Sequence, residues 1–378
     1  MSGSKLRVFE AFAGIGAQAS ALEKLNINYE IVGISDWFID AIECYAAIHC
    51  DNEVNIGIPK TKSEILEALN HYTFSADSVH PYDINKLSFD RLISLYRANK
   101  ISKNYGSITS IQPEEMPDTD LLVYSFPCQD LSTGGLGKGM KKGSGTRSGL
   151  LWEIERILTG LAKINKLPEY LLLENVKTIK ASSNKDDLDQ WLLFLENIGY
   201  KNDDLMILNS LDFGVPQDRE RAFIVSHLGA KLDIKDKIEK KPRNYEFNDF
   251  FRVDYGNAIL KAEADIAQLN ATPSRQRMWE INGRDLNENT TVRTITCNMD
   301  RTHCAALFPY RGAKGDTFRR PTIREAFLLM GFTEAEYEKT IRLGYSYRKM
   351  NKLIGNSIVV NVLVEIFDKM FGEKYRRI

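Results

Sequence analysis

The feature that most constrains the fold of this 378-residue chain is the alternation of short apolar segments with longer amphipathic ones through its first 227 residues. Five apolar segments, rich in β-branched and aromatic residues, are expected to form strands: 5–12, 29–35, 120–126, 169–176 and 219–227. Segments of helical period lie between them, at 17–25, 36–49, 149–164 and 188–199. This alternation predicts an α/β domain with a largely parallel, doubly wound sheet and helices on both faces. Ligands of such sheets bind at the carboxyl ends of the strands.

The rhythm changes after residue 227. Segment 228–318 is first charged and irregular and then β-like, with 311–320 expected to be a loop, so a second, smaller domain is predicted there. Helical patterning returns in the C-terminal segment 319–378. Two further stretches, 51–80 and 88–117, interrupt the strand–helix series, and we expect polar, helical inserts without an assigned function.

Charge and cysteine content exclude several classes of protein. A net charge of −1 is unlike that of a protein that coats nucleic acid non-specifically, so any nucleic-acid contact must come from local basic clusters, such as 137–147, 239–243 and 311–320. The five cysteines are sparse and contain no CxxC pair, which argues against a disulfide framework and a structural zinc site and favours a reducing cytoplasm. We find no run of about 18 apolar residues and no signal peptide, so no membrane association is expected.

The first strand leads into a glycine-containing turn with Gly14 and Gly16, followed by a helix. Such a turn lets a ligand approach the backbone at the positive end of the helix, although it also occurs as a plain tight turn. Asp36 and Trp37 follow the second strand, where a carboxylate can bind ribose hydroxyls and an indole can stack on adenine. The third glycine of the dinucleotide-binding pattern is absent, as is a phosphate-binding loop, so NAD or FAD is disfavoured.

Polar residues also follow three other strands. Cys128 is constrained by Pro127, and its two interpretations are a small core residue and a nucleophile. Glu174 ends an apolar strand, where a raised pKa would suit a proton donor, although a structural glutamate is the common alternative. Arg219 and Arg221 are spaced to point to one face. The cysteine, the glutamate and the arginines together predict a single site.

In this order and spacing, "FAGIG", "SFPCQ", "ENV", "QDRER", "RRPTIREAFLLMGF" and "IGNSIVVNV" resemble the motifs of the DNA cytosine-5 methyltransferases, particularly the bacterial and mollicute type. The resemblance covers the chain except the inserts and 228–318. It implies a Rossmann-like class I methyltransferase sheet in a catalytic domain (1–227), a smaller target-recognition domain (228–318), and a segment (319–378) that returns to the catalytic domain. It also implies S-adenosylmethionine as cofactor, S-adenosylhomocysteine as product, and no metal.

The resemblance implies a role for each matched residue. Residues implied to bind the cofactor are Phe12, Gly14, Gly16, Asp36 on the ribose, Trp37 on the adenine, Asp83 and Ile84 on its other edge, and Asn356 and Ser357 on the methionine side. Those implied to act in catalysis are the nucleophile Cys128, the acid Glu174, and Arg219 and Arg221 beside the cytosine. Those implied to touch DNA are Gln129, Ser132, Arg147, Thr294 and Thr296. Three positions depart from the family pattern, namely Glu10, Asp36 and Phe126.

The implied reaction is methylation of a flipped-out cytosine in double-stranded DNA by a cytoplasmic, nucleoid-associated bacterial enzyme, monomeric and with a possible cognate restriction endonuclease. The glycine-rich loop 132–147 is expected to close over the DNA. Three alternatives are an RNA cytosine methyltransferase of the same fold, an inactive DNA-binding subunit and, more weakly, a nicotinamide dehydrogenase. The recognition sequence, the preference for unmethylated or hemimethylated DNA, and the base that removes the C5 proton are not readable from the sequence.

Overall fold

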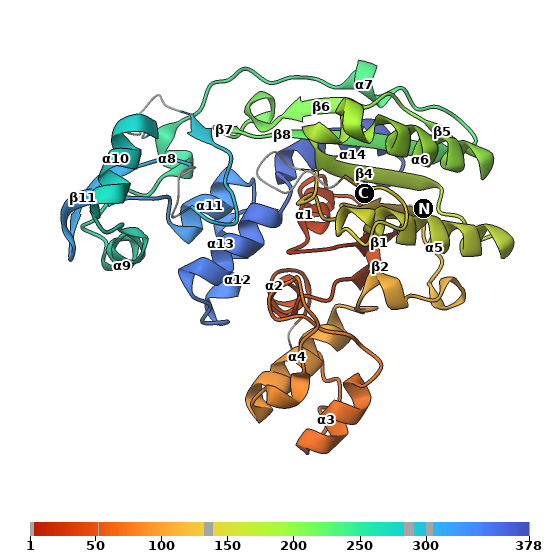
Figure 1. Ribbon diagram of the computed structural model, residues 1–378, viewed down its shortest axis with the longest axis horizontal. Coiled ribbons are helices and arrows are strands. Elements are labelled where there is room, and N and C mark those ends of the chain that lie inside the picture. The colour runs from red at the N-terminus through yellow and green to blue at the C-terminus, as the bar shows by residue number, and fades with distance from the viewer. Residues whose placement is uncertain (1–3, 52, 132–138, 283–290, 300–304, 378) are drawn as a thin grey trace. The chain divides into compact units, whose positions relative to one another are not determined.

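The structure is a computed structural model that describes residues 4–51, 53–131, 139–282, 291–299 and 305–377. The chain forms two compact units (Figure 1). Unit 1 consists of Met1–Leu208, Glu220–Glu239 and Val364–Ile378. Unit 2 consists of Asn209–Arg219 and Lys240–Leu363. These boundaries differ from the expected functional division, since most of 319–378 belongs to unit 2.

The central sheet has seven strands: β1 (Leu6–Ala11), β2 (Tyr29–Ser35), β3 (Leu121–Tyr124), β4 (Tyr170–Val176), β5 (Tyr200–Asn202), β6 (Met206–Asn209) and β8 (Glu220–Leu228). Their order is β2-β1-β3-β4-β8-β5, and β6 pairs with β8. Strands β1 to β4 are parallel, whereas β8 is antiparallel to both β4 and β5. The predicted α/β sheet is confirmed, with one reversed strand that the apolar pattern does not reveal.

Helices flank the central sheet (Figure 1), and successive side chains of each strand point to opposite faces of it. Phe9, Leu122 and Leu171 share one core with α5 (Leu151–Lys163) and α6 (Lys185–Asn197). Residues of the opposite face meet α1 (Ala17–Lys24) and the end of α14 (Val360–Phe371), where Tyr170 packs edge-on against Phe371 at 5.3 Å between ring centroids. Helices therefore cover both faces, as predicted.

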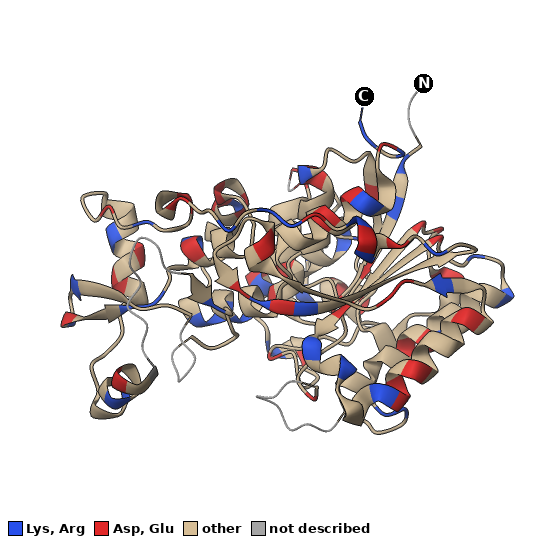
Figure 2. Cartoon of the chain, turned by 90° about the horizontal axis from the view of Figure 1, so that it is seen from above, with Lys and Arg blue, Asp and Glu red and all other residues tan. Residues whose placement is uncertain are grey.

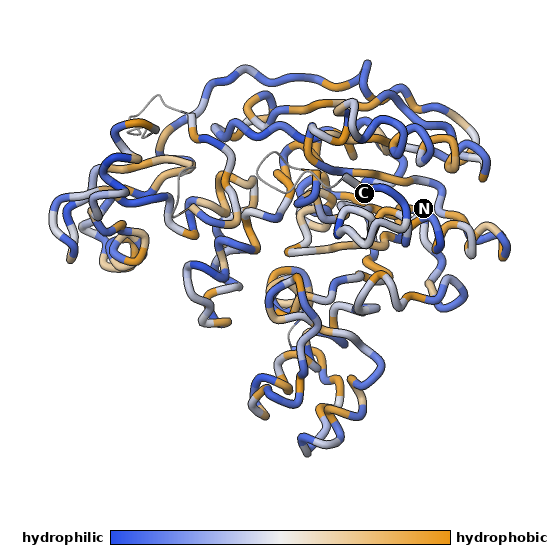
Figure 3. Tube along the Cα trace, viewed as in Figure 1, coloured by the Kyte–Doolittle hydropathy of each residue, from blue (hydrophilic) through white to orange (hydrophobic). Residues whose placement is uncertain are grey.

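The two inserts build a small core of their own. They contain α3 (Lys62–Leu69) and α4 (Phe89–Ile101), which pack with α2 (Ile39–His49) through Ile42, Ile65 and Leu92. Hydrophobic and hydrophilic residues mix along both insert helices (Figure 3), as expected for helices with one buried face. The helical prediction is confirmed, but the inserts are amphipathic rather than polar throughout.

Unit 2 contains short helices and two small pairs of strands. Its elements are β7 (Gln217–Asp218), α8 (Phe247–Phe250), α9 (Ala258–Ala267), α10 (Pro273–Asn282), β9 (Val292–Arg293), β10 (Phe308–Gly312), β11 (Gly315–Arg319), α11 (Ile323–Leu329), α12 (Glu334–Ile341) and α13 (Tyr347–Asn356). Strand β7 pairs in parallel with β9, and β10 forms an antiparallel hairpin with β11. The expected loop at 311–320 is wrong, because most of it belongs to this hairpin: Gly315, with φ of +75°, turns the chain between two strands that mix buried and exposed residues.

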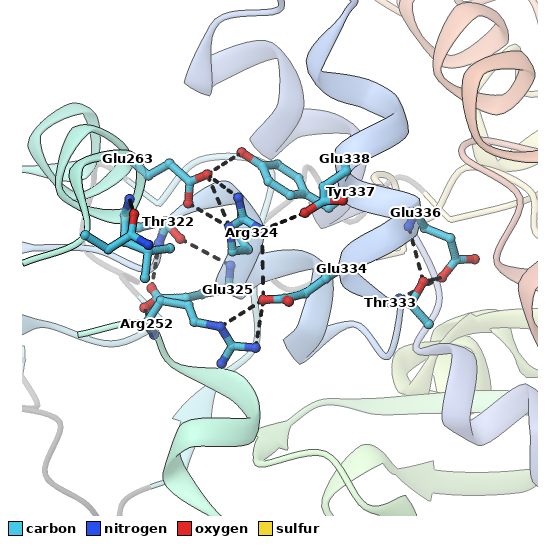
Figure 4. Close-up of polar contacts among 12 residues, drawn as sticks. Arg252, Glu263, Thr322, Arg324, Glu325, Thr333, Glu334, Glu336, Tyr337 and Glu338 are labelled. Atoms are coloured by element: carbon cyan, nitrogen blue, oxygen red, sulfur yellow. Dashed lines mark hydrogen bonds and ion pairs between the residues drawn. The ribbon is translucent and has the colours of Figure 1, made fainter. Parts of the chain in front are cut away.

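Buried ion pairs hold part of unit 2 together (Figure 4). The Arg319 guanidinium lies 2.8 Å from both carboxylate oxygens of Glu325, and neither side chain is exposed. Glu325 also accepts from the backbone of Arg252 and Thr322. Arg324 pairs with Glu263 at 2.9 Å. These contacts join α9, β11 and α11 by charge as well as by apolar packing.

One stretch, 347–371, comprises α13 and α14 and is long and apolar enough, by length and composition, to cross a membrane. Of its most apolar 18-residue window, 78% is buried inside the protein. This degree of burial is typical of the core helices of a protein.

Candidate active site

The reversed direction of β8 brings Arg221 to the strand end that carries Glu174. Because β8 is antiparallel to β4, its first residues lie beside the last residues of β4, with Arg221 opposite Val176. The Arg221 Nε atom lies 3.5 Å from Glu174 Oε1, and Glu174 is 7% exposed. In an all-parallel sheet, an arginine that begins a strand would lie at the opposite edge.

The cysteine segment after β3 is held through three carbonyl groups. Asn175 Nδ2 donates to the Phe126 carbonyl at 3.0 Å, and Ser148 Oγ donates to the Pro127 carbonyl at 2.7 Å. Thr178 Oγ1 donates to the carbonyl of Leu131 at 2.6 Å. Cys128 is half-buried between these anchors. Its backbone is therefore fixed on both sides, while the residue is partly exposed.

Two neighbouring residues of β4, Glu174 and Asn175, make different contacts at this edge. Successive side chains of a strand point to opposite faces. Asn175 points to the face of the main core and holds the cysteine segment, whereas Glu174 points to the other face and meets Arg221. The "ENV" motif thus supplies one anchoring amide and one carboxyl group.

Arg147 and Gln129 contact each other beside the cysteine. The Arg147 guanidinium donates to Gln129 Oε1 and, at 2.7 Å, to the carbonyl of Ser78. The backbone N–H groups of Arg147 and Ser148 donate to the carboxylate of Asp130 at 2.8 and 3.3 Å. The expected DNA-contacting residue Ser132 lies outside the described residues, as does the part of the glycine-rich loop up to residue 138.

The glycine turn after β1 adopts left-handed backbone conformations. Phe12, Gly14 and Gly16 have φ values of 58°, 58° and 77°. The two glycines serve different purposes: a Cβ atom on Gly16 would lie 2.3 Å from the His49 Nε2 atom, whereas a Cβ atom on Gly14 would meet nothing within 4 Å. Gly16 thus allows close packing on α2, and Gly14 presents backbone to open space.

Asp36 closes this turn, and it is held in turn by a residue that the sequence analysis missed. Its carboxylate accepts from the backbone N–H of Gly14 at 2.9 Å and of Phe38 at 2.8 Å. Burial raises the pKa of Asp36 to about 6, against these hydrogen bonds, which lower it. Asn104 binds both backbone groups of Asp36, each at 3.0 Å. No local pattern identifies Asn104, because its partner lies 68 residues upstream.

The other residues expected to bind adenine lie on two connected segments. Trp37 is half-buried, and its carbonyl accepts from the backbone N–H of Ser75 at 2.7 Å. Asp83 is exposed and caps a short helical turn, Ile84–Lys86, with a hydrogen bond to Asn85 that lowers the pKa of Asp83. Ile84 is half-buried. The first insert therefore ends in strand-like contact with the residues that follow β2.

The remaining expected site residues belong to unit 2. Thr294 Oγ1 donates to the Asp218 carbonyl at 2.6 Å, and Thr296 Oγ1 donates to that of Asn298 at 3.1 Å. Asn356 is exposed and Ser357 is 8% exposed. Arg219 is 3% exposed and lies between β7 and β8, so strand alternation does not pair it with Arg221. Its guanidinium binds backbone carbonyl groups of unit 2.

Acidic and basic residues are interspersed along the chain (Figure 2). Among the residues that the structure describes, no group of three or more His, Cys, Asp or Glu side chains could hold a metal ion. The carboxyl of Glu10 is fully buried, and burial raises its pKa to about 8. The groups described at the strand edge are the thiol of Cys128, the carboxyl of Glu174 and the guanidinium of Arg221.

Comparison with known proteins identifies the family of this chain. The C-5 cytosine-specific DNA methylase family matches residues 86–372. The chain belongs to this family. It is 37% identical to the orphan methyltransferase M.SssI of Spiroplasma monobiae, over 97% of this chain and 98% of that protein. It is 36% identical to the type II methyltransferase M2.ScrFI of Lactococcus lactis subsp. cremoris, over 97% and 99%. The protein is a DNA cytosine-5 methyltransferase.

Solved structures agree on the fold. The S. pombe Dnmt2 methyltransferase matches with a TM-score of 0.63 at 20% identity, over 96% of this chain and 97% of that one. The Entamoeba histolytica methyltransferase EhMeth matches with a TM-score of 0.62 at 16% identity, over 98% and 99%. The chain therefore shares its fold with these structures over nearly its whole length.

Proposed function

We propose that this methyltransferase transfers a methyl group from S-adenosylmethionine to C5 of a flipped-out cytosine in a specific double-stranded DNA sequence. The observation that carries the proposal is the strand edge where Cys128 follows β3 and Glu174 meets Arg221 at 3.5 Å. Family membership supports the reaction, and we assign the nucleophile to Cys128 and the acid to Glu174 at this edge. The flipping of the base follows because C5 and C6 are enclosed in a stacked duplex.

The residues around the glycine turn suit the cofactor. Gly14 presents backbone to open space, and Asp36 is fixed beside it by Asn104. We propose that Asp36 binds the ribose, that Trp37, Asp83 and Ile84 bind the adenine, and that Phe12, Gly16, Asn356 and Ser357 complete the site. S-adenosylmethionine would supply an electrophilic methyl group and leave as S-adenosylhomocysteine. The proposed chemistry assigns no role to a metal.

The proposed reaction explains why a thiol and a carboxyl are needed together. The Cys128 thiolate attacks C6 of the cytosine while Glu174 gives a proton to N3, so C5 becomes an enamine-like carbon. C5 then takes the methyl group. Loss of the C5 proton to a base, expulsion of the thiolate and return of the N3 proton to the Glu174 carboxylate restore the aromatic ring. Arg221, beside Glu174, stabilises charge that develops on the cytosine oxygen.

DNA binding is assigned to two regions. We propose that Gln129, Ser132 and Arg147 contact DNA around the flipped base, and that Thr294 and Thr296 contact it from unit 2. The region 228–318 would read the target sequence, with 1–227 and 319–378 forming the catalytic part. The similar proteins M.SssI and M2.ScrFI are named an orphan and a type II methyltransferase, respectively. We therefore propose a cognate restriction endonuclease as a partner of this enzyme. The enzyme would act as a monomer in the bacterial cytoplasm, at the nucleoid.

The test is transfer of labelled methyl groups from S-adenosylmethionine to unmethylated genomic DNA, followed by base-resolution mapping. Wild-type protein is compared with Cys128→Ala and with the control Cys50→Ala, and tRNA serves as the competing substrate. We expect label at C5 of cytosines in one DNA sequence, lost in Cys128→Ala and kept in Cys50→Ala. Label on tRNA alone, or none on DNA, would contradict the proposal.

A further inference from the structure

Two segments of unit 2 with different proposed ligands touch each other directly. The threonine segment (292–298) carries Thr294 and Thr296, proposed to contact DNA. The Asn-Ser segment (355–357) carries Asn356 and Ser357, proposed to contact the cofactor. A Cβ atom on Gly355 would lie 2.4 Å from the backbone N of Cys297 and 2.4 Å from the backbone C of Thr296. The two backbones are therefore in contact with no side chain between them.

A single buried guanidinium spans both segments. Arg219 Nη1 donates to the carbonyl of Ile295 in the threonine segment at 2.8 Å. Arg219 Nη2 donates to the carbonyls of Gly355 and Ser357 in the Asn-Ser segment at 3.1 and 2.7 Å. A guanidinium is planar and presents its donors at fixed angles, so three simultaneous bonds fix the spacing of the carbonyls.

Further contacts reinforce this junction. Cys297 Sγ lies 2.8 Å from Asn356 Oδ1, so the junction reaches a residue proposed to bind the cofactor. Asn351 Nδ2 donates to the Thr296 carbonyl at 3.1 Å. Gln217, two residues before Arg219, accepts from the Ile295 N–H at 2.9 Å and donates to the Leu329 carbonyl at 2.8 Å. Displacement of either segment would disturb the other through several bonds at once.

From these contacts we propose that Arg219 is a positioning residue that couples DNA binding at the threonine segment to cofactor binding at the Asn-Ser segment. This inference rests on the proposed function, since it takes the ligands of both segments from there. A ligand that orders one segment also orders the other, so the second ligand meets a segment that is already in place. The coupling must be reciprocal: the cofactor product strengthens DNA binding by the same factor as DNA strengthens product binding.

The experiment measures the Kd of S-adenosylhomocysteine with and without a duplex bearing the mapped target site, and the Kd of the duplex with and without S-adenosylhomocysteine. For the wild-type enzyme we expect both ratios to agree, at about 5- to 150-fold. Arg219→Lys keeps the positive charge, but an ammonium group lacks the planar donor geometry that binds the three carbonyls. The ratio of the Kd values without and with the other ligand should therefore fall toward one in this variant. Arg156→Lys is the control, because the Arg156 guanidinium also binds two backbone carbonyls, those of Ile111 and Ile108, and no ligand is proposed for it.

Asn351→Ala provides a second route if Arg219→Lys does not fold. It removes one bond of the same junction, and it should lower the ratio by a smaller factor. A wild-type enzyme that methylates DNA but shows a ratio of one overturns the coupling and leaves the proposed function intact. A wild-type ratio retained by folded Arg219→Lys, or by Asn351→Ala when Arg219→Lys does not fold, also overturns the coupling. A protein that binds neither ligand overturns the proposed function as well.

Discussion

The cysteine segment of unit 1 and the junction of unit 2 are fixed by opposite means. Around Cys128, three neutral side chains, those of Asn175, Ser148 and Thr178, each hold one carbonyl. In unit 2, Arg219 alone holds three carbonyls. A change of one residue removes one of these bonds around Cys128, whereas a change of Arg219 removes three bonds of the junction at once.

The two units also differ in how they accommodate a buried carboxyl group. In unit 1, Glu10 is buried and its pKa is raised, so the group is protonated at neutral pH. In unit 2, Glu325 is equally buried but bound to the Arg319 guanidinium. Substitutions in unit 2 should therefore damage stability most, and substitutions at the strand edge of unit 1 should damage the reaction most.

Loss of the arginine partner of Glu325 should have the largest effect on stability. Arg319→Met leaves the carboxylate buried without its cation, so we expect a loss of about 3–5 kcal/mol in the free energy of unfolding. Urea denaturation followed by tryptophan fluorescence measures it. Arg311→Met, which breaks an exposed ion pair, should cost less than about 1 kcal/mol. If the two variants lost the same free energy of unfolding, the buried ion pair would contribute no more to stability than the exposed one, contrary to this prediction.

Loss of the proposed acid should affect the rate rather than the stability. Glu174→Gln keeps the shape of the side chain but cannot give a proton to N3, so we expect kcat to fall by about 10²- to 10⁴-fold. Single-turnover methyl transfer gives the rate, and thermal unfolding shows whether the fold is unchanged. Glu220→Gln breaks an exposed pair with Lys177 and serves as the control. A rate equal to that of the control would remove Glu174 from the mechanism.

Removal of one anchor of the cysteine segment should have a smaller effect. Thr178→Val replaces the hydroxyl by a methyl group of similar size and leaves the Leu131 carbonyl without that donor. We expect the activation free energy of methyl transfer to rise by about 1 kcal/mol, the usual worth of one hydrogen bond. This corresponds to a kcat that is about fivefold lower, with an unchanged KM for the cofactor. Thr178→Ser keeps the hydroxyl and should keep the rate. If Thr178→Ser is as slow as Thr178→Val, the hydrogen bond is not what matters.

The pH dependence of stability should reveal the buried carboxyl of unit 1. Because the pKa of Glu10 is raised in the folded protein to about 8, its contribution is fully present below the unfolded pKa of about 4.3 and is lost as pH rises toward 8. Glu10→Gln remains neutral at every pH. The wild-type Tm should therefore fall relative to that of Glu10→Gln between pH 5 and pH 8. Parallel Tm curves would show that Glu10 is charged in the folded state.

Much of the fold and of the strand-edge site could be predicted, because the information is local. Apolar segments mark the strands, and Cys128 and Glu174 lie at or just beyond strand ends in the sequence itself. The direction of β8 could not be predicted, since the apolar pattern of a strand is the same in both directions. Nor could the hairpin of β10 and β11, because residues 311–317 at its centre are mostly polar or glycine.

The residues that hold the site in place were missed for a different reason. Ser148 and Asn104 bind backbone atoms 21 and 68 residues away, and a serine or asparagine in a polar stretch carries no local sign of such a contact. Arg219 was expected beside Arg221 because of its i, i+2 spacing. That spacing implies a shared face only within a strand, and Arg219 lies between two strands.

The most direct test of the account is to trap the bond between Cys128 and the cytosine. In duplex DNA made with 5-fluorocytosine, the C5 proton is replaced by fluorine, which cannot leave as a cation, so the methylated adduct should persist. We predict a denaturation-resistant protein–DNA complex that requires S-adenosylmethionine, maps to Cys128 by peptide mass spectrometry, and is absent from Cys128→Ala. A complex that maps to another residue, or none from an enzyme that methylates ordinary DNA, would contradict the central claim.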